Sequence, residues 1–148
     1  MRGSYQLLVL LFLAGLCSPE KGGVHRVFSR PIPGALQNVS KNDTGVKKAV
    51  LTGTYSFNNK SNDAFLFKAS AVDCAKRQIV KGVRYILEVE ISRTVCRKMG
   101  HNEDLINCPF QTDSLLRQTF FCHFDVWSIP WMQKMVTEYF NCRSFDNL

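Results

Sequence analysis

The chain of 148 residues carries six cysteines and three histidines, the side chains that most often act as nucleophile, general base or metal ligand. His25 lies in a Pro- and Gly-rich stretch, His101 lies in a polar segment, and His123 lies on a predicted strand. None of them has an evident nucleophile partner, since a dyad of Cys74 with His123 would be an accident of two strands. The sequence also lacks metal-ligand spacing, phosphate-binding loops and dinucleotide fingerprints. We therefore expect no enzyme, no metal site and no cofactor.

Two apolar turns are the more informative candidates, and the chemistry they indicate is binding. They consist of Gln78-Ile79-Val80-Lys81-Gly82 and of Pro130-Trp131. The glycine of the first turn can supply the positive φ of a tight hairpin, and its isoleucine and valine give an uncharged edge. The second turn offers a rigid proline ring and an indole. Two such apolar tips on one small domain predict a wedge-like surface that binds a partner.

A helix is predicted before the first turn. Apolar residues between positions 46 and 57 recur at three- and four-residue spacing, as in an amphipathic helix of about four turns. Asn42, Asp43 or Thr44 can cap its start, and the polar cluster Asn58–Asp63 ends it. The buried face is expected to consist of Val46, Ala49, Val50, Gly53, Thr54 and Phe57.

Strands are predicted on both sides of each turn. Apolar and other residues alternate with a period of two over Phe65–Ser70, Val83–Ser92 and Phe120–Val126, and Met135–Cys142 supplies a last strand. Each strand has one apolar face, so the chain should form an α+β fold whose antiparallel sheet wraps across a single helix.

The start of the chain has the composition of a secretory signal. Arg2 supplies a positive charge, and Leu7–Leu16 is an apolar run followed by small and polar residues. No later segment approaches the roughly 18 apolar residues of a membrane span, so a secreted protein is expected, with an uncleaved anchor as the alternative. The predicted organisation is a signal peptide over 1–22, a flexible arm over 23–42 and one domain over 43–148.

The surface is expected to be mildly basic and glycosylated. The formal net charge is +7, but the cations are scattered singly or in pairs, without the dense basic tract of a nucleic-acid surface. Three Asn-x-Ser/Thr sequons are candidate glycosylation sites, and they lie at Asn38, Asn42 and Asn59.

The two turns, in this order, resemble the inhibitory loops of the type 2 cystatins, which are secreted inhibitors of papain-like cysteine proteases such as cathepsins. The resemblance covers roughly Pro31 to Cys142 and matches Gly34 to the glycine of that family's N-terminal arm. It implies the cystatin fold, with about five strands around one long helix. It also implies reversible, tight-binding, competitive inhibition, in which the arm and both turns plug the active-site cleft without presenting a cleavable peptide bond.

The resemblance further implies two C-terminal disulfides, Cys96–Cys108 and Cys122–Cys142. Each would close a loop that contributes on the order of 3 kcal/mol in an oxidising compartment. Cys17 leaves with the signal peptide, so Cys74 is expected to be unpaired, either as a half-buried thiol or as a link to a second chain. The expected state is a monomer, or a dimer through Cys74 or domain swapping.

A second binding site is suggested by Ser61-Asn62-Asp63. Some cystatins use an asparagine in this loop to occupy the specificity pocket of legumain, and Asn62 matches that residue. The alternative is an ordinary turn residue.

Within the family, the segments Asn62-Asp63, Phe65–Lys68 and Leu87–Ile91 are most similar to the leukocystatin subgroup. The sequence leaves open whether the protein also reaches endosomes and lysosomes.

A second function also remains open, namely a cystatin-fold protein that has lost inhibition and acts through a receptor or surface contact. Members that lose inhibition commonly lose the Gln-x-Val-x-Gly pattern. Here Gln78, Val80 and Gly82 all stand in place, which favours the inhibitor.

Overall fold

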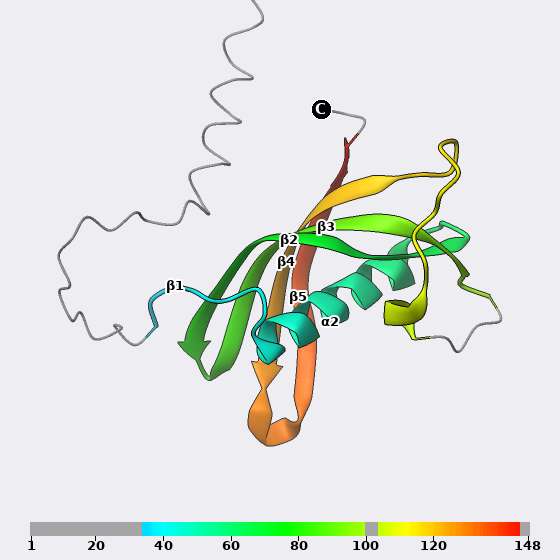
Figure 1. The fold of residues 1–148 in the computed structure, drawn as a ribbon. Helices are drawn as coiled ribbons and strands as arrows, with labels where there is room; N and C mark the ends of the chain where they lie inside the picture. The colour runs from blue at the N-terminus through cyan, green and yellow to red at the C-terminus, as the bar shows by residue number, and fades with distance from the viewer. Residues whose placement is uncertain (1–33, 100–103, 146–148) are drawn as a thin grey trace, which may run out of the picture. The chain divides into compact units, whose positions relative to one another are not determined.

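The structure, a computed structural model, describes residues 34–99 and 104–145, which form a single sheet curved around one long helix (Figure 1). The strands are antiparallel and follow the order β1-β2-β3-β4-β5. The elements are β1 (Gln37–Asn38), α2 (Thr44–Lys60), β2 (Phe65–Val80), β3 (Gly82–Arg97), η1 (Leu105–Asn107), β4 (Thr119–Ile129), η2 (Pro130–Met132) and β5 (Lys134–Ser144). The predicted signal peptide, most of the predicted arm, and His101 lie outside the described residues. None of the helices in the described ranges is long and apolar enough to cross a membrane.

Helix α2 begins where the sequence offered three capping candidates, and Asp43 is the one used. Its Oδ1 accepts hydrogen bonds from the backbone N–H groups of Gly45 at 2.9 Å and Val46 at 3.2 Å, which stabilises the first turn. The predicted apolar face is confirmed, because five of its six residues are buried and Phe57 packs against the core. Gly53 permits a close approach of helix and sheet, since a Cβ atom there would lie 2.7 Å from the Phe124 ring.

The end of the helix is tied to β2 by a buried amide. The Asn58 side chain donates to the carbonyl oxygen of Phe67 and accepts from its N–H, both at 2.9 Å. These two bonds satisfy a polar side chain that is only 3% exposed. Asn58 was predicted to belong to a terminating turn, but it is a structural residue of the last helical turn.

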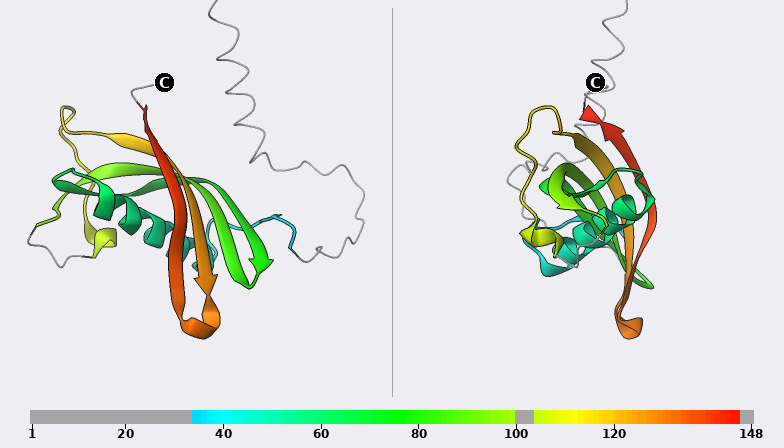
Figure 2. Two further views of the ribbon diagram at one scale, coloured as in Figure 1. Left: turned by 180° about the vertical axis from the view of Figure 1, so that it is seen from behind. Right: turned by 90° about the vertical axis from the view of Figure 1, so that its right-hand side faces the viewer.

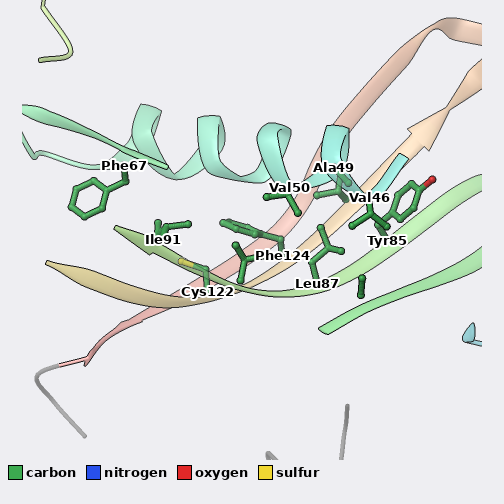
Figure 3. Close-up of a cluster of buried hydrophobic side chains, with 12 residues drawn as sticks. Val46, Ala49, Val50, Phe67, Tyr85, Leu87, Ile91, Cys122 and Phe124 are labelled. Atoms are coloured by element: carbon green, nitrogen blue, oxygen red, sulfur yellow. The ribbon is translucent and has the colours of Figure 1, made fainter. Parts of the chain in front are cut away.

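The alternating patterns of β3 and β4 are confirmed. Alternate residues of these strands face the helix and form the core shown in Figure 3, where the helix lies directly over the sheet. The residues that β3 and β4 contribute to this core are Tyr85, Leu87, Val89, Ile91, Cys122, Phe124 and Val126. Strand β2 departs from simple alternation because its pairing with β3 shifts register at three places. As a result, both Cys74 and Ala75 are buried.

Both predicted disulfides are confirmed. Cys96 and Cys108 are joined with their Cα atoms 5.8 Å apart, and Cys122 and Cys142 with theirs 4.1 Å apart. The expectation of an unpaired Cys74 is wrong, because Cys74 is disulfide-bonded as well and no free cysteine occurs in the described ranges.

Strand β1 was not predicted, because a strand of two residues has no measurable period. Gln37 and Asn38 pair with Arg77 and Lys76 of β2, and the Val39 N–H donates to the Ala75 carbonyl oxygen at 3.0 Å. These bonds fix the last part of the predicted arm along the outer edge of β2.

Candidate functional site

The two predicted turns lie at the same end of the sheet, where the β2–β3 and β4–β5 hairpins both end (Figures 1 and 2). The strand register explains this arrangement. Val83 pairs with Ile79 on one side and with Ser128 on the other, and Ser128 pairs with Met135. Both turns therefore project from one row of paired residues.

The first turn is tight, with Val80 paired to Gly82 and Lys81 at the tip. Gly82 has a φ of 95°, a conformation that side-chain-bearing residues rarely adopt. A Cβ atom on Gly82 would also lie 2.3 Å from the Ser128 carbonyl oxygen. The glycine is thus required twice, by the turn and by the neighbouring strand. Ile79 and Val80 leave 52% and 44% of their surface exposed.

A side chain of β4 holds this turn in place. The indole N–H of Trp127 donates to the Lys81 carbonyl oxygen at 2.7 Å, which links the hairpin tip to the next strand. Trp127 was not among the predicted site residues. Its only sequence signal is its position on a strand four residues before the second tryptophan.

The second turn is a short 3₁₀ segment. Pro130 occupies its first turn, where no backbone donor is needed, and Gln133 closes it with a φ of 48° and an N–H bond to the Pro130 carbonyl oxygen at 3.0 Å. Trp131 and Met132 are 67% and 60% exposed, whereas Ile129 below them is buried. Met132 is a second exposed residue that was not predicted to belong to the site.

The described start of the arm contacts the first turn. Gly34 has a φ of 86°, and its carbonyl oxygen accepts a hydrogen bond of 2.7 Å from the side chain of Gln78. Gln78 is half-buried, so its side chain positions the arm rather than facing outward. Leu36, which was not among the predicted site residues, is exposed beyond this contact.

Together these segments form a surface that we call the apolar edge. Its exposed residues are Leu36, Ile79, Val80, Trp131 and Met132. Behind the edge, Arg84 and Asp125 form an ion pair in which Arg84 Nε donates to Asp125 Oδ1 at 2.8 Å. The hydrogen bond to Asp125 raises the pKa of Arg84, so the guanidinium stays charged. The edge can bury apolar surface against a partner.

The possible dyad of Cys74 with His123 does not exist in the structure. Cys74 is disulfide-bonded, and Nδ1 of His123 is hydrogen-bonded to the Glu88 carboxylate. This bond raises the pKa of His123, and the desolvation that lowers it is the smaller effect. Residues 34–99 and 104–145 contain no cluster of His, Cys, Asp and Glu that could hold a metal ion.

The loop with Asn62 lies at the other end of β2. Asn62 is exposed, while its neighbours are held: Ser61 Oγ accepts from the Asp63 N–H at 3.1 Å, and Asp63 Oδ1 accepts from the Phe65 N–H at 2.9 Å. Asp63 also forms an ion pair with Arg93. Burial alone would raise the pKa of Asp63, but the bonds from Arg93 and Phe65 outweigh it and lower that pKa.

The three sequon asparagines, Asn38, Asn42 and Asn59, are exposed. Asn38 lies on β1, Asn42 just before α2 and Asn59 near the end of that helix. Their side chains therefore face solvent, as a glycan requires.

Residues 34–131 match the Cystatin domain, and the chain belongs to the cystatin family, whose members are inhibitors of cysteine proteases rather than enzymes. It is 44% identical over 143 residues to cystatin-F of Mus musculus, covering 93% of this chain and 99% of the mouse protein. It is 45% identical over 114 residues to cystatin-F of Homo sapiens, covering 77% of this chain and 78% of the human protein. A crystal structure of dimeric human cystatin F matches with a TM-score of 0.73 and 42% identity, over 82% of this chain and 95% of that one.

Proposed function

We propose that the protein is a secreted, reversible, tight-binding inhibitor that competes with substrate for the active-site cleft of papain-like cysteine proteases of the cathepsin class. The observation that carries this proposal is the apolar edge. Five apolar side chains that would be more stable in an interior are exposed together at one end of the sheet, on backbone held by hydrogen bonds from Gln78 and Trp127. In a protease cleft these side chains would lose their contact with water. Their backbone is already ordered, so binding would not have to order it first.

The proposed mechanism assigns a role to each segment. Ile79, Val80 and Trp131 are the anchors that fill the cleft on either side of the protease's catalytic cysteine, with Lys81 and Pro130 beside them. The arm at Gly34 lies in the remaining part of the cleft. Because the Val80–Gly82 backbone is paired within its own hairpin, it offers the protease no extended peptide to cleave.

The proposal includes export from the cell, with endosomes and lysosomes as a second destination. Three features support it: the signal-like composition of residues 1–22, the disulfides of the domain, and exposed sequons at Asn38, Asn42 and Asn59. We propose that at least one of these asparagines is glycosylated and that residues 43–148 form the folded domain with 23–42 as its arm.

A titration of papain and several cathepsins with the mature protein tests the proposal. Val80→Asp combined with Trp131→Ala should weaken papain inhibition about a thousandfold or more, because a buried, unpaired carboxylate and a lost anchor each cost about 2 kcal/mol or more. Circular dichroism should not change, since both residues are exposed. An unchanged inhibition constant would contradict the proposal. A wild-type protein that inhibits none of the enzymes would favour the non-inhibitory alternative.

A second candidate function is inhibition of legumain through Asn62. It is favoured by the way the loop presents this one exposed amide while Ser61 and Asp63 are held by hydrogen bonds. Asn62→Ala should remove legumain inhibition and spare papain, whereas Asn107→Ala, at another exposed asparagine, should change neither. A wild-type protein without effect on legumain, even after deglycosylation, would make Asn62 an ordinary turn residue.

A further inference from the structure

A groove that is separate from the apolar edge lies between α2, the first half of β2 and the η1 segment. Its volume is 500 Å³, which falls within the roughly 300–1,000 Å³ of small-molecule sites. The wall from α2 includes Val50 and Leu51, and the wall from β2 includes Val72. Ile106 and Phe110 close the third side. The interior of the groove is thus mainly apolar.

Four lysines surround this apolar lining, and none of the twelve lining residues is acidic. They are Lys41, Lys47, Lys48 and Lys68. In the described part of the chain no ion pair neutralises any of them. Lys68 is directed to the groove by a cation–π contact, with its Nζ 4.4 Å from the centre of the Phe110 ring. The groove therefore combines an apolar interior with uncompensated positive charge.

The groove is preformed. The Cys96–Cys108 disulfide ties the third wall to β3, and Leu105 of this wall is buried. On the same wall, Ile106 leaves 74% of its surface exposed and Phe110 leaves 38%. Apolar side chains that remain exposed beside a hollow favour a ligand that covers them.

The lining has few groups that could bind a polar chain. The Thr54 hydroxyl already donates to the Val50 carbonyl oxygen at 2.7 Å within the helix. A peptide in this groove would bury backbone N–H and C=O groups without partners, at a cost for each. A hydrocarbon chain has no such groups. The ligand chemistry that fits is therefore an apolar chain with a single anionic head.

We propose that this groove binds a free long-chain monocarboxylate of the fatty-acid class, with the chain against Val50, Leu51 and Ile106 and the carboxylate among the lysines. This site is independent of the apolar edge. Protease inhibition is not required for it and is not part of its test.

Fluorescence titration with 11-(dansylamino)undecanoic acid, and its displacement by oleate, tests the proposal on the mature protein. Saturable binding of one probe per chain is expected below the critical micelle concentration. Lys47→Glu with Lys48→Glu should weaken binding at least about tenfold by repelling the carboxylate. The matched control, Arg117→Glu with Arg143→Glu, makes the same charge change on exposed residues that do not line the groove. It should leave binding unchanged.

A second pair of variants tests the apolar part. Ile106→Asp should weaken binding at least about tenfold, because it places a carboxylate against the chain. Leu115→Asp changes a residue that is 90% exposed outside the groove and should have no effect. Both residues are exposed, so circular dichroism and the thermal melting curve should match those of the wild type.

Four results would overturn the proposal. The first is the absence of saturable binding of the probe. The second is equal binding of a dodecyl ammonium ion, which carries the opposite charge. The third is binding only to vesicles of phosphatidylserine, which would make this face a membrane surface. The fourth is an equal loss of binding in the groove variants and their controls.

Discussion

The two ends of β2 hold their loops by different means. At the Val80 end, strand pairing and two neutral side-chain bonds, from Gln78 and Trp127, fix the backbone while apolar side chains face solvent. At the Phe65 end, the Asp63–Arg93 ion pair holds a polar loop. The first end exposes apolar side chains of the kind that a folded protein normally buries. At the second end, an ion pair fixes the loop.

The contrast indicates that the proposed binding surface and the residues that stabilise the fold lie in separate regions. The exposed side chains of the apolar edge add little to the free energy of unfolding, because they contact solvent rather than the core. The residues that fix the two loops do contribute to stability. Variants at the two ends should therefore separate protease inhibition from stability.

Gly82→Ala should weaken papain inhibition at least about a hundredfold and destabilise the fold by about 2 kcal/mol. The added Cβ would clash with the Ser128 carbonyl oxygen, and the positive φ adds about 1–2 kcal/mol of strain. Inhibition assays and urea unfolding measure both effects. Gly34→Ala is the matched control, because it has a similar φ but no atom within 4 Å of the added Cβ. It should cost only about 1 kcal/mol, and a Gly82 variant as active as the wild type would contradict the account of the turn.

Asp63→Asn should lower the free energy of unfolding by about 1–3 kcal/mol and leave papain inhibition unchanged. The substitution leaves the largely buried Arg93 without its counter-charge. Asp113→Asn, at an exposed turn, should be neutral. The pKa of Asp63 is lowered in the fold, so this contribution is fully present above the ordinary aspartate pKa of about 4 and is lost as pH falls through the lower, folded value. A loss of papain inhibition would show that the two ends are coupled.

Trp127→Phe should weaken papain inhibition about tenfold while the free energy of unfolding falls by no more than about 1 kcal/mol. The phenyl ring keeps most of the packing but cannot donate to the Lys81 carbonyl oxygen, so the tip becomes less ordered before binding. Inhibition constants and urea unfolding curves of the two proteins give the comparison. An equal loss in stability and in binding would mean that the indole supports the whole sheet rather than the turn.

The sequence predicted the fold well where a local pattern controls it. The alternation of buried residues in β3 holds from Tyr85 to Ile91, and the start of α2 is decided by one capping side chain, Asp43. Strand β1 and the register shifts of β2 were beyond prediction, because they depend on hydrogen bonds between segments far apart in the sequence. The disulfide of Cys74 was not predicted, because Cys74 was taken to be unpaired once the other cysteines had been assigned.

The candidate site was predictable only at its tips. Gly82 and Pro130 mark turns by their backbone chemistry, which the sequence displays directly. The roles of Gln78 and Trp127 depend on bonds to residues 44 and 46 positions away, and no local pattern reports such contacts. Leu36 and Met132 become visible as candidates only once their exposure is known.

The smallest expected effect concerns the His123–Glu88 pair on the sheet between the two ends. The bond to Glu88 raises the folded pKa of His123, so its contribution is fully present below the ordinary histidine pKa of about 6.5 and is lost as pH rises through the folded value. His123→Gln should therefore cost stability at pH 5.5 and nothing at pH 8.5. The pair is about two-fifths exposed, which limits the cost to under about 1 kcal/mol. Urea unfolding of the wild type and the variant at both pH values measures this loss of stability. A loss that grows with pH would contradict a stabilising bond between His123 and Glu88.

Hydrogen–deuterium exchange of the protein, free and bound to papain, shows which backbone segments contact the protease. If the apolar edge enters the protease cleft, slower exchange in the complex should be confined to the backbone around residues 34–37, 78–83 and 129–134. Exchange in α2 and around Asn62 should not change. Protection concentrated on α2 and residues 104–118, with the three edge segments exchanging as in the free protein, would contradict the claim.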